Sequence, residues 1–185
     1  MNNLSGTTYH SPVIETHLTS PVGLLALKAS SVGLTHLTVV DLQQQSSQVT
    51  PLSETSIVQK DSQQYLEQDI THAKSHIKNV QKQLDEYFSA RRKSFDAPLA
   101  PKGTEFQQQV WQALAELPFG QTCSYADIAS SIHRPKAVRA VGAANGANPI
   151  AIIVPCHRVI GKSGKLTGYA YGLEMKQFLL NLESQ

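Results

Sequence analysis

The stretch SYADIASSIHRPKAVRAVGAANGANP, residues 124–149, contains two short helical segments on either side of a turn. The first segment follows Ser124, a residue type that caps helix N-termini. The second runs from Lys136, directly after a proline, and ends at Gly146 or Asn148, before the next proline. Two short helices joined by a tight turn, with a basic second member, predict a helix-turn-helix, which is a DNA-binding element.

The segment before it predicts a longer helix. In TEFQQQVWQALAEL, residues 104–117, Thr104 is a plausible N-cap. The apolar positions Phe106, Val110, Trp111, Leu114 and Leu117 fall on one helical face. The preceding stretch FDAPLAPKG, residues 95–103, carries prolines and a closing glycine and predicts a linker. We therefore expect two domains, residues 1–97 and 98–185.

The first domain begins with strands and ends with a helix. Residues 13–20, 23–30 and 33–40 are short apolar or alternating runs separated by Pro/Ser/Val/Gly turns, which favours an antiparallel meander. The polar residues 43–56 predict a loop. From about residue 62 to 90 one apolar stripe recurs at helical spacing, formed by Tyr65, Ile70, Ala73, Ile77, Val80, Leu84 and Phe88.

The composition limits the class of protein. The chain has 185 residues, 41% hydrophobic and 16% charged, which suits one compact domain or two small ones. No apolar run approaches the ~20 residues of a membrane span. Residues 1–17 lack the basic start and apolar core of a signal peptide. Two cysteines, Cys123 and Cys156, are too few for a disulfide framework, so a cytoplasmic protein with free thiols is predicted.

Positive charge gathers in the second part of the chain. Residues 1–100 hold eight Lys/Arg against nine Asp/Glu, and residues 101–185 hold eight against five. No acidic residue lies between Asp127 and Glu174, although six Lys/Arg do. Such a distribution favours a polyanionic partner, because neutralising phosphates releases counterions. A solvated basic face without a partner accounts for it equally well.

Cys156 lies between an apolar run and two basic residues. AIIV, residues 151–154, predicts a buried strand, and His157 and Arg158 follow the cysteine directly. Adjacent cations or a histidine lower the pKa of a thiol and so make it nucleophilic. The alternative is a buried inert cysteine, the commoner fate of a lone one. Structural zinc is disfavoured, because it needs about four ligands and the chain has no CxxC or Cys/His cluster.

The long motif around this cysteine decides between the two. RAVGAANGANPIAIIVPCHRVIG, residues 139–161, closely resembles the signature of the O6-alkylguanine-DNA alkyltransferases, specifically the bacterial stand-alone type. TEFQQQVWQALAELPFGQTCSYADIA, residues 104–129, resembles the segment that precedes this signature in the family, and the tail that ends in LLNLE also fits. The resemblance covers residues 104–183, while the first hundred residues carry no specific motif.

The resemblance implies both a fold and an activity. It implies an α/β (α+β) N-terminal domain, ribonuclease H-like, with antiparallel strands and a helix, followed by a mainly α, winged-helix-like domain that binds DNA and accepts the alkyl group. Members of this family repair DNA by flipping the damaged base and moving the alkyl group of O6-alkylguanine, or in second place O4-alkylthymine, irreversibly onto their own cysteine. Each molecule acts once, without a cofactor.

The resemblance also assigns catalytic roles. Cys156 is implied as the acceptor and His157 as its base, acting through a bound water. Glu183 is implied to orient His157, in a relay related in logic to hydrolase triads. Asn148 is implied to order the turn before the cysteine.

On the DNA side, Tyr125 is implied to meet the phosphate beside the lesion and to hydrogen-bond the flipped base, and Arg139 to take the place of the extruded nucleotide. Small residues on the second helix would permit close docking in the minor groove. The remaining expected contacts are Lys136, Ala137, Gly142 and Ala143 for DNA, and Tyr125, Pro155, Val159, Tyr169, Ala170 and Tyr171 for the substrate pocket.

The sequence departs from family variants in two places. Residues 1–100 contain no cysteine, although some relatives bind zinc there, so we predict no metal. Many relatives carry Gly-Gly in the pocket loop where this chain has Tyr171 and Gly172, so we expect Tyr171 to narrow the pocket. The expected partner is double-stranded DNA bound by a monomer, with no membrane and with cooperativity on DNA left open. A non-catalytic binder of alkylated DNA and a plain helix-turn-helix regulator are the rivals, both disfavoured by the Pro-Cys-His-Arg run.

Overall fold

The first half of the chain forms an antiparallel sheet. The structure, a computed structural model, describes residues 10–40, 56–58 and 66–185. The strands β1 (Ile14–Ser20), β2 (Gly23–Ser30) and β3 (Gly33–Val39) form a meander, and the short β4 (Ser56–Ile57) pairs with β1, so that the order is β3-β2-β1-β4. The three predicted strands are confirmed. The predicted loop 43–56 lies outside the described residues, except for Ser56, which begins β4.

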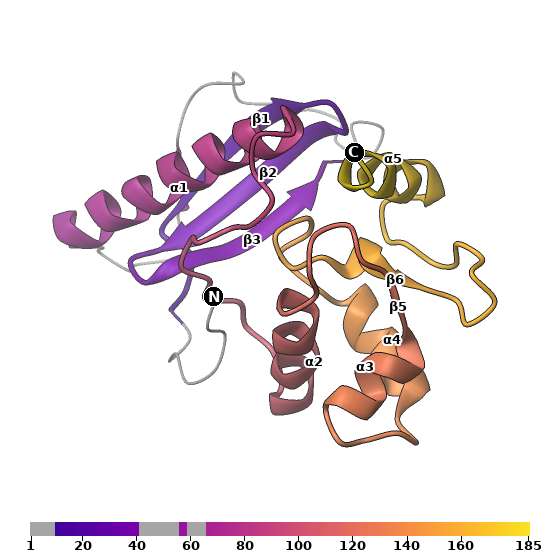
Figure 1. The fold of residues 1–185 in the computed structure, drawn as a ribbon. Coiled ribbons are helices and arrows are strands. Elements are labelled where there is room, and N and C mark those ends of the chain that lie inside the picture. Colours follow the sequence, from indigo (N-terminus) through magenta and orange to yellow (C-terminus); the bar gives the residue numbers. More distant parts are fainter. Residues whose placement is uncertain (1–9, 41–55, 59–65) are drawn as a thin grey trace.

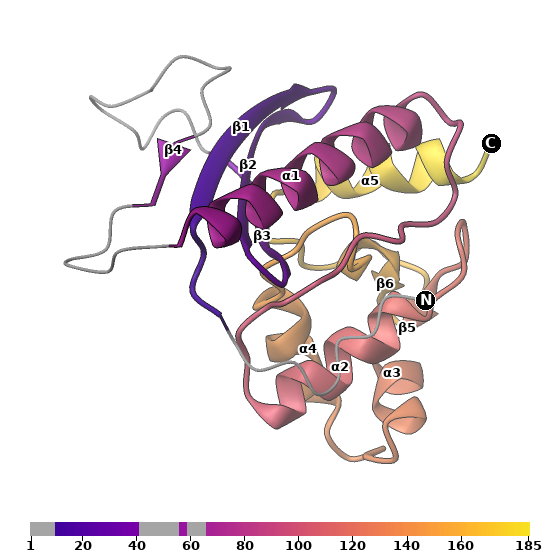
Figure 2. The ribbon, with the colours of Figure 1, turned by 90° about the vertical axis from the view of Figure 1, so that its left-hand side faces the viewer.

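A long helix covers one face of this sheet. Helix α1 (Glu67–Phe88) packs across β1, β2 and β3 (Figures 1 and 2). The predicted stripe is buried at Ala73, Ile77, Val80 and Leu84 and packs into the main hydrophobic core. The predicted helix is therefore confirmed over residues 67–88, while residues 62–65 lie outside the described part.

The second half is mainly helical, with α2 (Glu105–Ala115), α3 (Tyr125–Ser131), α4 (Val138–Gly146) and α5 (Leu173–Glu183). A short parallel pair, β5 (Cys123–Ser124) and β6 (Val159–Ile160), joins the start of α3 to the residues after Cys156. The two predicted N-caps, Thr104 and Ser124, are confirmed, and each forms a reciprocal capping box. No helix in the described ranges is long and apolar enough to cross a bilayer.

Helices α3 and α4 form the predicted helix-turn-helix. Helix α4 begins at Val138 rather than at Lys136, because residues 134–137 close a turn in which the Ala137 N–H donates to the Arg134 carbonyl at 2.8 Å. The buried Trp111 of α2 donates its indole N–H to the Ala144 carbonyl at 2.8 Å and so holds α2 against α4.

The second half also closes the β3 edge of the sheet. The backbone of Leu34 pairs with the predicted linker, through bonds to Pro98 and from Ala100 of 2.9 and 2.7 Å. The linker can come this close to the start of β3 only because residue 33 is a glycine. A Cβ on Gly33 would lie 2.6 Å from the Pro98 carbonyl oxygen. Farther along β3, Leu37 pairs with residues 149–151 through two bonds of 2.9 Å. The sheet therefore supports the segment that leads to Cys156.

The predicted strand at residues 151–154 is wrong. These residues are buried, but they form turns in which the Val154 N–H donates to the Ile150 carbonyl at 3.1 Å and Ile152 adopts a left-handed φ of 70°. The apolar run marks burial, and burial alone does not distinguish a strand from a buried turn.

Candidate active site

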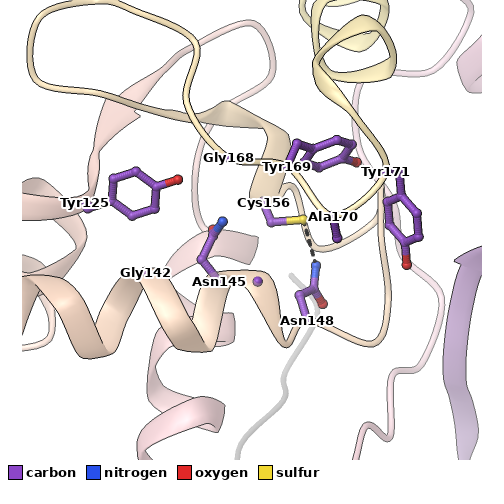
Figure 3. Close-up of a pocket in the computed structure, with 10 residues that line it drawn as sticks. Tyr125, Gly142, Asn145, Asn148, Cys156, Gly168, Tyr169, Ala170 and Tyr171 are labelled. Atoms are coloured by element: carbon purple, nitrogen blue, oxygen red, sulfur yellow. Dashed lines mark hydrogen bonds between the residues drawn. The ribbon is translucent and has the colours of Figure 1, made fainter.

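A pocket of about 370 Å³ opens between the helix-turn-helix and the loop that precedes α5 (Figure 3). Cys156 is part of its lining and is buried, and Figure 3 shows the sulfur facing Asn148 and the loop. The residues that line it are Tyr125, Gly142, Asn145, Gly146, Asn148, Cys156, Gly168, Tyr169, Ala170 and Tyr171. The pocket thus brings the cysteine of one segment together with helix and loop residues from two others.

The thiol of Cys156 is buried and protonated at rest. Cys156 begins a short 3-10 turn (Cys156–Arg158) and is 5% exposed. Burial raises the pKa of Cys156, and a hydrogen bond from the Asn148 amide to Sγ at 3.2 Å acts in the opposite direction. The expectation that the adjacent Arg158 lowers this pKa is wrong, because the Arg158 side chain turns to Glu183.

Asn148 ties the turn before the cysteine to the cysteine itself. Its side-chain N–H group donates to the carbonyls of Ile150 and Val154 at 3.3 and 2.8 Å, as well as to Sγ of Cys156. Its side-chain oxygen accepts from the Ile150 N–H at 3.0 Å. One buried amide therefore determines both the shape of the turn after α4 and the direction of the thiol.

Behind the cysteine, Glu183 of α5 accepts hydrogen bonds from three side chains. Arg158 donates to both carboxylate oxygens, at 2.7 and 3.0 Å, and His157 Nε2 lies 2.8 Å from Oε1. The hydroxyl of Tyr87, at the end of α1, donates to Oε1 at 2.8 Å. Burial would raise the pKa of Glu183, but the bonds from His157 and Arg158 outweigh it and hold this pKa well below its usual range. Glu183 is therefore a buried carboxylate anion.

The state of His157 follows from that anion. A carboxylate can only accept hydrogen bonds, so His157 Nε2 carries a proton. Burial lowers the pKa of His157, although Glu183 partly offsets it, so the ring is neutral at neutral pH. The other ring nitrogen, Nδ1, is then an acceptor, and it is buried without a hydrogen-bond partner among the described residues. His157 consequently presents one free basic atom in the interior.

Two tyrosines of the loop form the opposite wall of the pocket. The rings of Tyr169 and Tyr171 meet edge to face, with centroids 5.6 Å apart. Burial raises the pKa of Tyr171, and a hydrogen bond with the backbone of Val39, at the end of β3, acts in the opposite direction. Tyr171 is thus held on one side by the Tyr169 ring of the loop and on the other by the Val39 backbone of the sheet.

Five of the predicted DNA contacts lie in α4 or in the two residues before it. Lys136, Arg139 and Ala143 are exposed, whereas Ala137 and Gly142 are half-buried. Tyr125, the first residue of α3, lines the pocket beside Gly142. The structure does not bring all the predicted pocket residues together. Pro155 and Val159 are buried and do not line the pocket.

Sequence reasoning missed three residues around the site. Tyr87 comes from the other half of the chain, and no local pattern points to it. Lys176 is buried, and its ammonium donates to the carbonyls of Val159 and Thr167 at 2.6 and 2.9 Å. Arg158 was noted for its charge but not as the partner of Glu183, although Glu183 was expected to reach this site. A single lysine or tyrosine in an amphipathic helix gives no signal of such contacts.

The described residues contain no group of three or more His, Cys, Asp or Glu side chains that could hold a metal ion. The absence of a metal and of a cofactor stays a prediction for the whole chain.

Comparison with known proteins agrees with this geometry. The family model described as 6-O-methylguanine DNA methyltransferase, DNA binding domain, matches residues 105–185. A methylated-DNA–protein-cysteine methyltransferase of Methanosarcina mazei is 60% identical over 115 residues, 62% of this chain and 73% of the relative. One of Mycolicibacterium paratuberculosis is 44% identical over 164 residues, 89% of this chain and 88% of the relative.

The solved structures extend the similarity to the first half. A crystal structure of Mycobacterium tuberculosis OGT in complex with DNA is 41% identical, with a TM-score of 0.72 over 92% of each chain. The predicted fold class, an α/β half followed by a mainly helical half, is thereby confirmed. Since the similarity spans both halves, this chain belongs to the methylated-DNA–protein-cysteine methyltransferase family.

Proposed function

We propose that this protein repairs alkylated DNA by one irreversible transfer. The alkyl group on O6 of guanine, or in second place on O4 of thymine, moves to Sγ of Cys156. The observation that carries the proposal is a buried thiol in the lining of a pocket whose walls come from a helix-turn-helix and a loop. The relatives are named for transfer from methylated DNA to a protein cysteine. A protein that only bound alkylated DNA would not need this cysteine there.

The transfer balances without a cofactor. A lone pair of Sγ forms a bond to the alkyl carbon as the bond between that carbon and O6 breaks, and the released electron pair passes into the guanine ring. Guanine takes up one proton, at N1, and the thiol gives up one. The thioether that results no longer has a proton to lose and cannot form a thiolate. Each molecule of protein therefore acts once.

His157 is the base in this proposal. Burial keeps the Cys156 thiol protonated, so the attack requires a proton acceptor. The neutral ring of His157 has a free lone pair on Nδ1, which would receive the proton through a water. Glu183 holds Nε2 and stabilises the imidazolium that forms. Asn148 supports the thiolate, because its amide N–H already donates to Sγ.

The DNA would approach along α4. In a duplex the alkylated oxygen lies within the base stack, and Cys156 is buried in the lining of a pocket, so the base must rotate out of the helix to react. Arg139 is exposed on α4, where it can fill the space that the base leaves, and Lys136 can neutralise phosphate. The small side chains of Ala137, Gly142 and Ala143 permit close contact with the groove.

The flipped base would enter between the two walls of the pocket. We assign Tyr125 to the phosphate beside the lesion and to the base, and Tyr169 and Ala170 of the loop to the guanine edge. Pro155 and Val159 were expected to join this recognition, but both lie outside the lining and the Val159 carbonyl accepts from Lys176, so we assign them to the support of the cysteine turn. The pocket volume of about 370 Å³ lies in the range of small-molecule sites.

The setting of the reaction is also part of the proposal. Residues 98–185 would carry the whole DNA-binding and acceptor surface, with residues 1–97 as a separate domain. The protein would act in the cytoplasm, as a monomer, on double-stranded DNA that contains O6-alkylguanine.

Intact-protein mass spectrometry tests the proposal. After incubation with duplex DNA containing O6-methylguanine, we expect a gain of one methyl group, located on the peptide that contains Cys156. Cys156→Ser should bind the same DNA but gain nothing, because the phosphate contacts remain. Cys123→Ser is the matched control and should be methylated like the wild type, since burial raises the pKa of Cys123 to about 11 and it lies outside the pocket. Repeated turnover in excess substrate would contradict a single irreversible transfer.

A further inference from the structure

One hydrogen bond joins the sheet-bearing half of the molecule to the acceptor site. Tyr87 is the penultimate residue of α1, is 1% exposed, and donates its hydroxyl to Oε1 of Glu183 at 2.8 Å. Its ring packs against Phe88, Phe95 and Phe119, with centroids 5.4, 5.3 and 6.3 Å away. A phenylalanine at this position would pack equally well in the aromatic cluster. The hydroxyl group is therefore the part of Tyr87 that requires an explanation.

We propose that Tyr87 is a positioning residue for alkyl transfer, whose hydroxyl holds the Glu183 carboxylate in the orientation in which Oε1 accepts from His157. This inference rests on the proposed function, because it concerns the same site. It gives the first half of the chain a part in the chemistry, which had been expected only of residues 98–185.

The hydrogen bonds on Glu183 show why a further donor matters. Oε2 is held by Arg158 Nε at 2.7 Å and by the Gly120 N–H at 3.3 Å. Oε1 accepts from His157, from Arg158 and from Tyr87, and the His157 and Tyr87 bonds are both 2.8 Å long. Arg158 holds the carboxylate along one edge. The tyrosine hydroxyl adds a second anchor on the oxygen that faces the histidine, which limits rotation of the carboxylate about that edge.

Tyr87 also affects how strongly Glu183 attracts a proton on His157. Burial, followed by the Glu183 charge, raises the pKa of Tyr87 far above its usual value, so the hydroxyl remains a donor across the working pH range. The other charged or titratable groups that the described residues place around Tyr87, Glu183 and His157 are Arg158, Lys176, Cys156, Tyr169 and Lys93, the last of which lies over the Phe119 ring. A carboxylate that loses one donor becomes a stronger acceptor for the remaining ones. Loss of the Tyr87 hydroxyl should therefore raise the pKa of His157.

Tyr87→Phe keeps the ring and removes the hydroxyl. We would measure single-turnover methyl transfer to Cys156 from a single-stranded oligonucleotide containing O6-methylguanine, as a function of pH, so that base flipping does not limit the rate. At neutral pH we expect the rate constant to fall about tenfold, the change that corresponds to one hydrogen bond to a charged group. His157 must be neutral to act as a base, so the acidic limb of the profile should move to higher pH.

Gln83→Leu is the matched control. Gln83 lies one turn earlier on α1, is 1% exposed, and hydrogen-bonds Asn79 and Asp96 without touching Glu183. This variant should lose stability but keep the wild-type rate and profile. In a Glu183→Gln background, Tyr87→Phe should have little further effect on the rate, because the group that it positions is already altered.

A second replacement keeps the hydroxyl. With 3,5-difluorotyrosine at position 87 the phenol is a stronger donor, so the acidic limb should move to lower pH. If the wild type transfers methyl groups and neither replacement moves the acidic limb, the positioning role is overturned, even if Tyr87→Phe is unstable. If the wild type itself takes up no methyl group, the proposed function fails instead, so the two failures are distinguishable.

Discussion

Within the site, the hydrogen-bond partners of a side chain determine its chemical state, and these partners are not its neighbours in the sequence. Cys156, His157 and Arg158 are consecutive, yet Sγ contacts Asn148, whereas the histidine and the arginine both bind Glu183. A buried thiol with a raised pKa is protected until a base removes its proton. The reactivity of Cys156 therefore comes from the site as a whole rather than from charges beside it in the chain.

Tyr171 offers a test at this scale. Its ring lines the pocket, meets Tyr169 edge to face and is held by the Val39 backbone, so we expect it to narrow the entrance. The wild type should react readily with O6-methylguanine in DNA and poorly with free O6-benzylguanine. Tyr171→Gly should raise the benzyl rate about tenfold, the discrimination that steric fit in a pocket provides. Single-turnover rates on both substrates measure this.

Tyr171→Phe is the control for that prediction, because it keeps the ring but gives up the bond to Val39. If volume alone decides, the phenylalanine variant should retain the wild-type preference. An unchanged ratio of methyl to benzyl rates in Tyr171→Gly would show that the ring does not restrict entry.

Sequence could identify the residues that share a motif but not those that meet across the fold. Cys156, His157 and Asn148 belong to one continuous run, and Glu183 came from the family resemblance. Tyr87 lies 96 positions before Glu183 and was not part of the predicted stripe, which included the adjacent Phe88 instead. Its contact depends on how α1 and α5 pack together, which periodicity within one helix does not encode.

At the scale of elements, a capping motif predicts where a helix begins, whereas an apolar run predicts burial but not the type of element. The Thr104 and Ser124 caps were predictable because a capping box is local, with the partner side chain three residues away. The run 151–154 does not form the predicted strand, because its side chains reach the main core while its backbone folds into turns bound by Leu37 of β3 and by the nearby Asn148 amide. Helix α4 begins two residues later than predicted for a different reason, because a hydrogen bond within residues 134–137 closes a turn there.

A substitution in helix α4 tests the proposed contact with DNA. Arg139→Ala should slow repair in duplex DNA by about tenfold or more, because the free energy of base flipping is a few kcal/mol and this side chain is proposed to offset part of it. Reaction with free O6-methylguanine should be unaffected. Single-turnover transfer on the two substrates separates the effects. Lys78→Ala, which removes an exposed cation from α1, is the control and should change neither rate. An equal loss on both substrates would exclude a role in flipping.

At the scale of the whole molecule, the Glu183 cluster links α1, α5 and the segment after Cys156. Because the pKa of Glu183 is lower in the folded state than its ordinary value of 4.5, its ionisation stabilises the fold above that pH. This contribution should be lost progressively as the pH falls below 4.5. At neutral pH, Glu183→Gln should lower the free energy of unfolding by about 3 kcal/mol, because Arg158 loses its buried counter-charge.

Thermal unfolding across acidic pH checks this. The melting temperature of the wild type should fall more steeply below pH 4.5 than that of Glu183→Gln, whose amide does not titrate. Glu174→Gln changes an exposed carboxylate on the same helix and should follow the wild-type curve. Parallel curves for the wild type and Glu183→Gln would show that the cluster does not contribute through its charge.

The closed β3 edge has a consequence for how the chain is made. During synthesis the meander leaves the ribosome long before residues 149–151. The backbone N–H and C=O groups of Leu37 can therefore form their bonds to these residues only after more than a hundred further residues have been added. An open strand edge can pair with the same edge of another nascent chain. Nascent chains on neighbouring ribosomes of one messenger RNA would therefore compete with the protein's own second half for pairing with the β3 edge. This competition would last until the active-site turn has been translated.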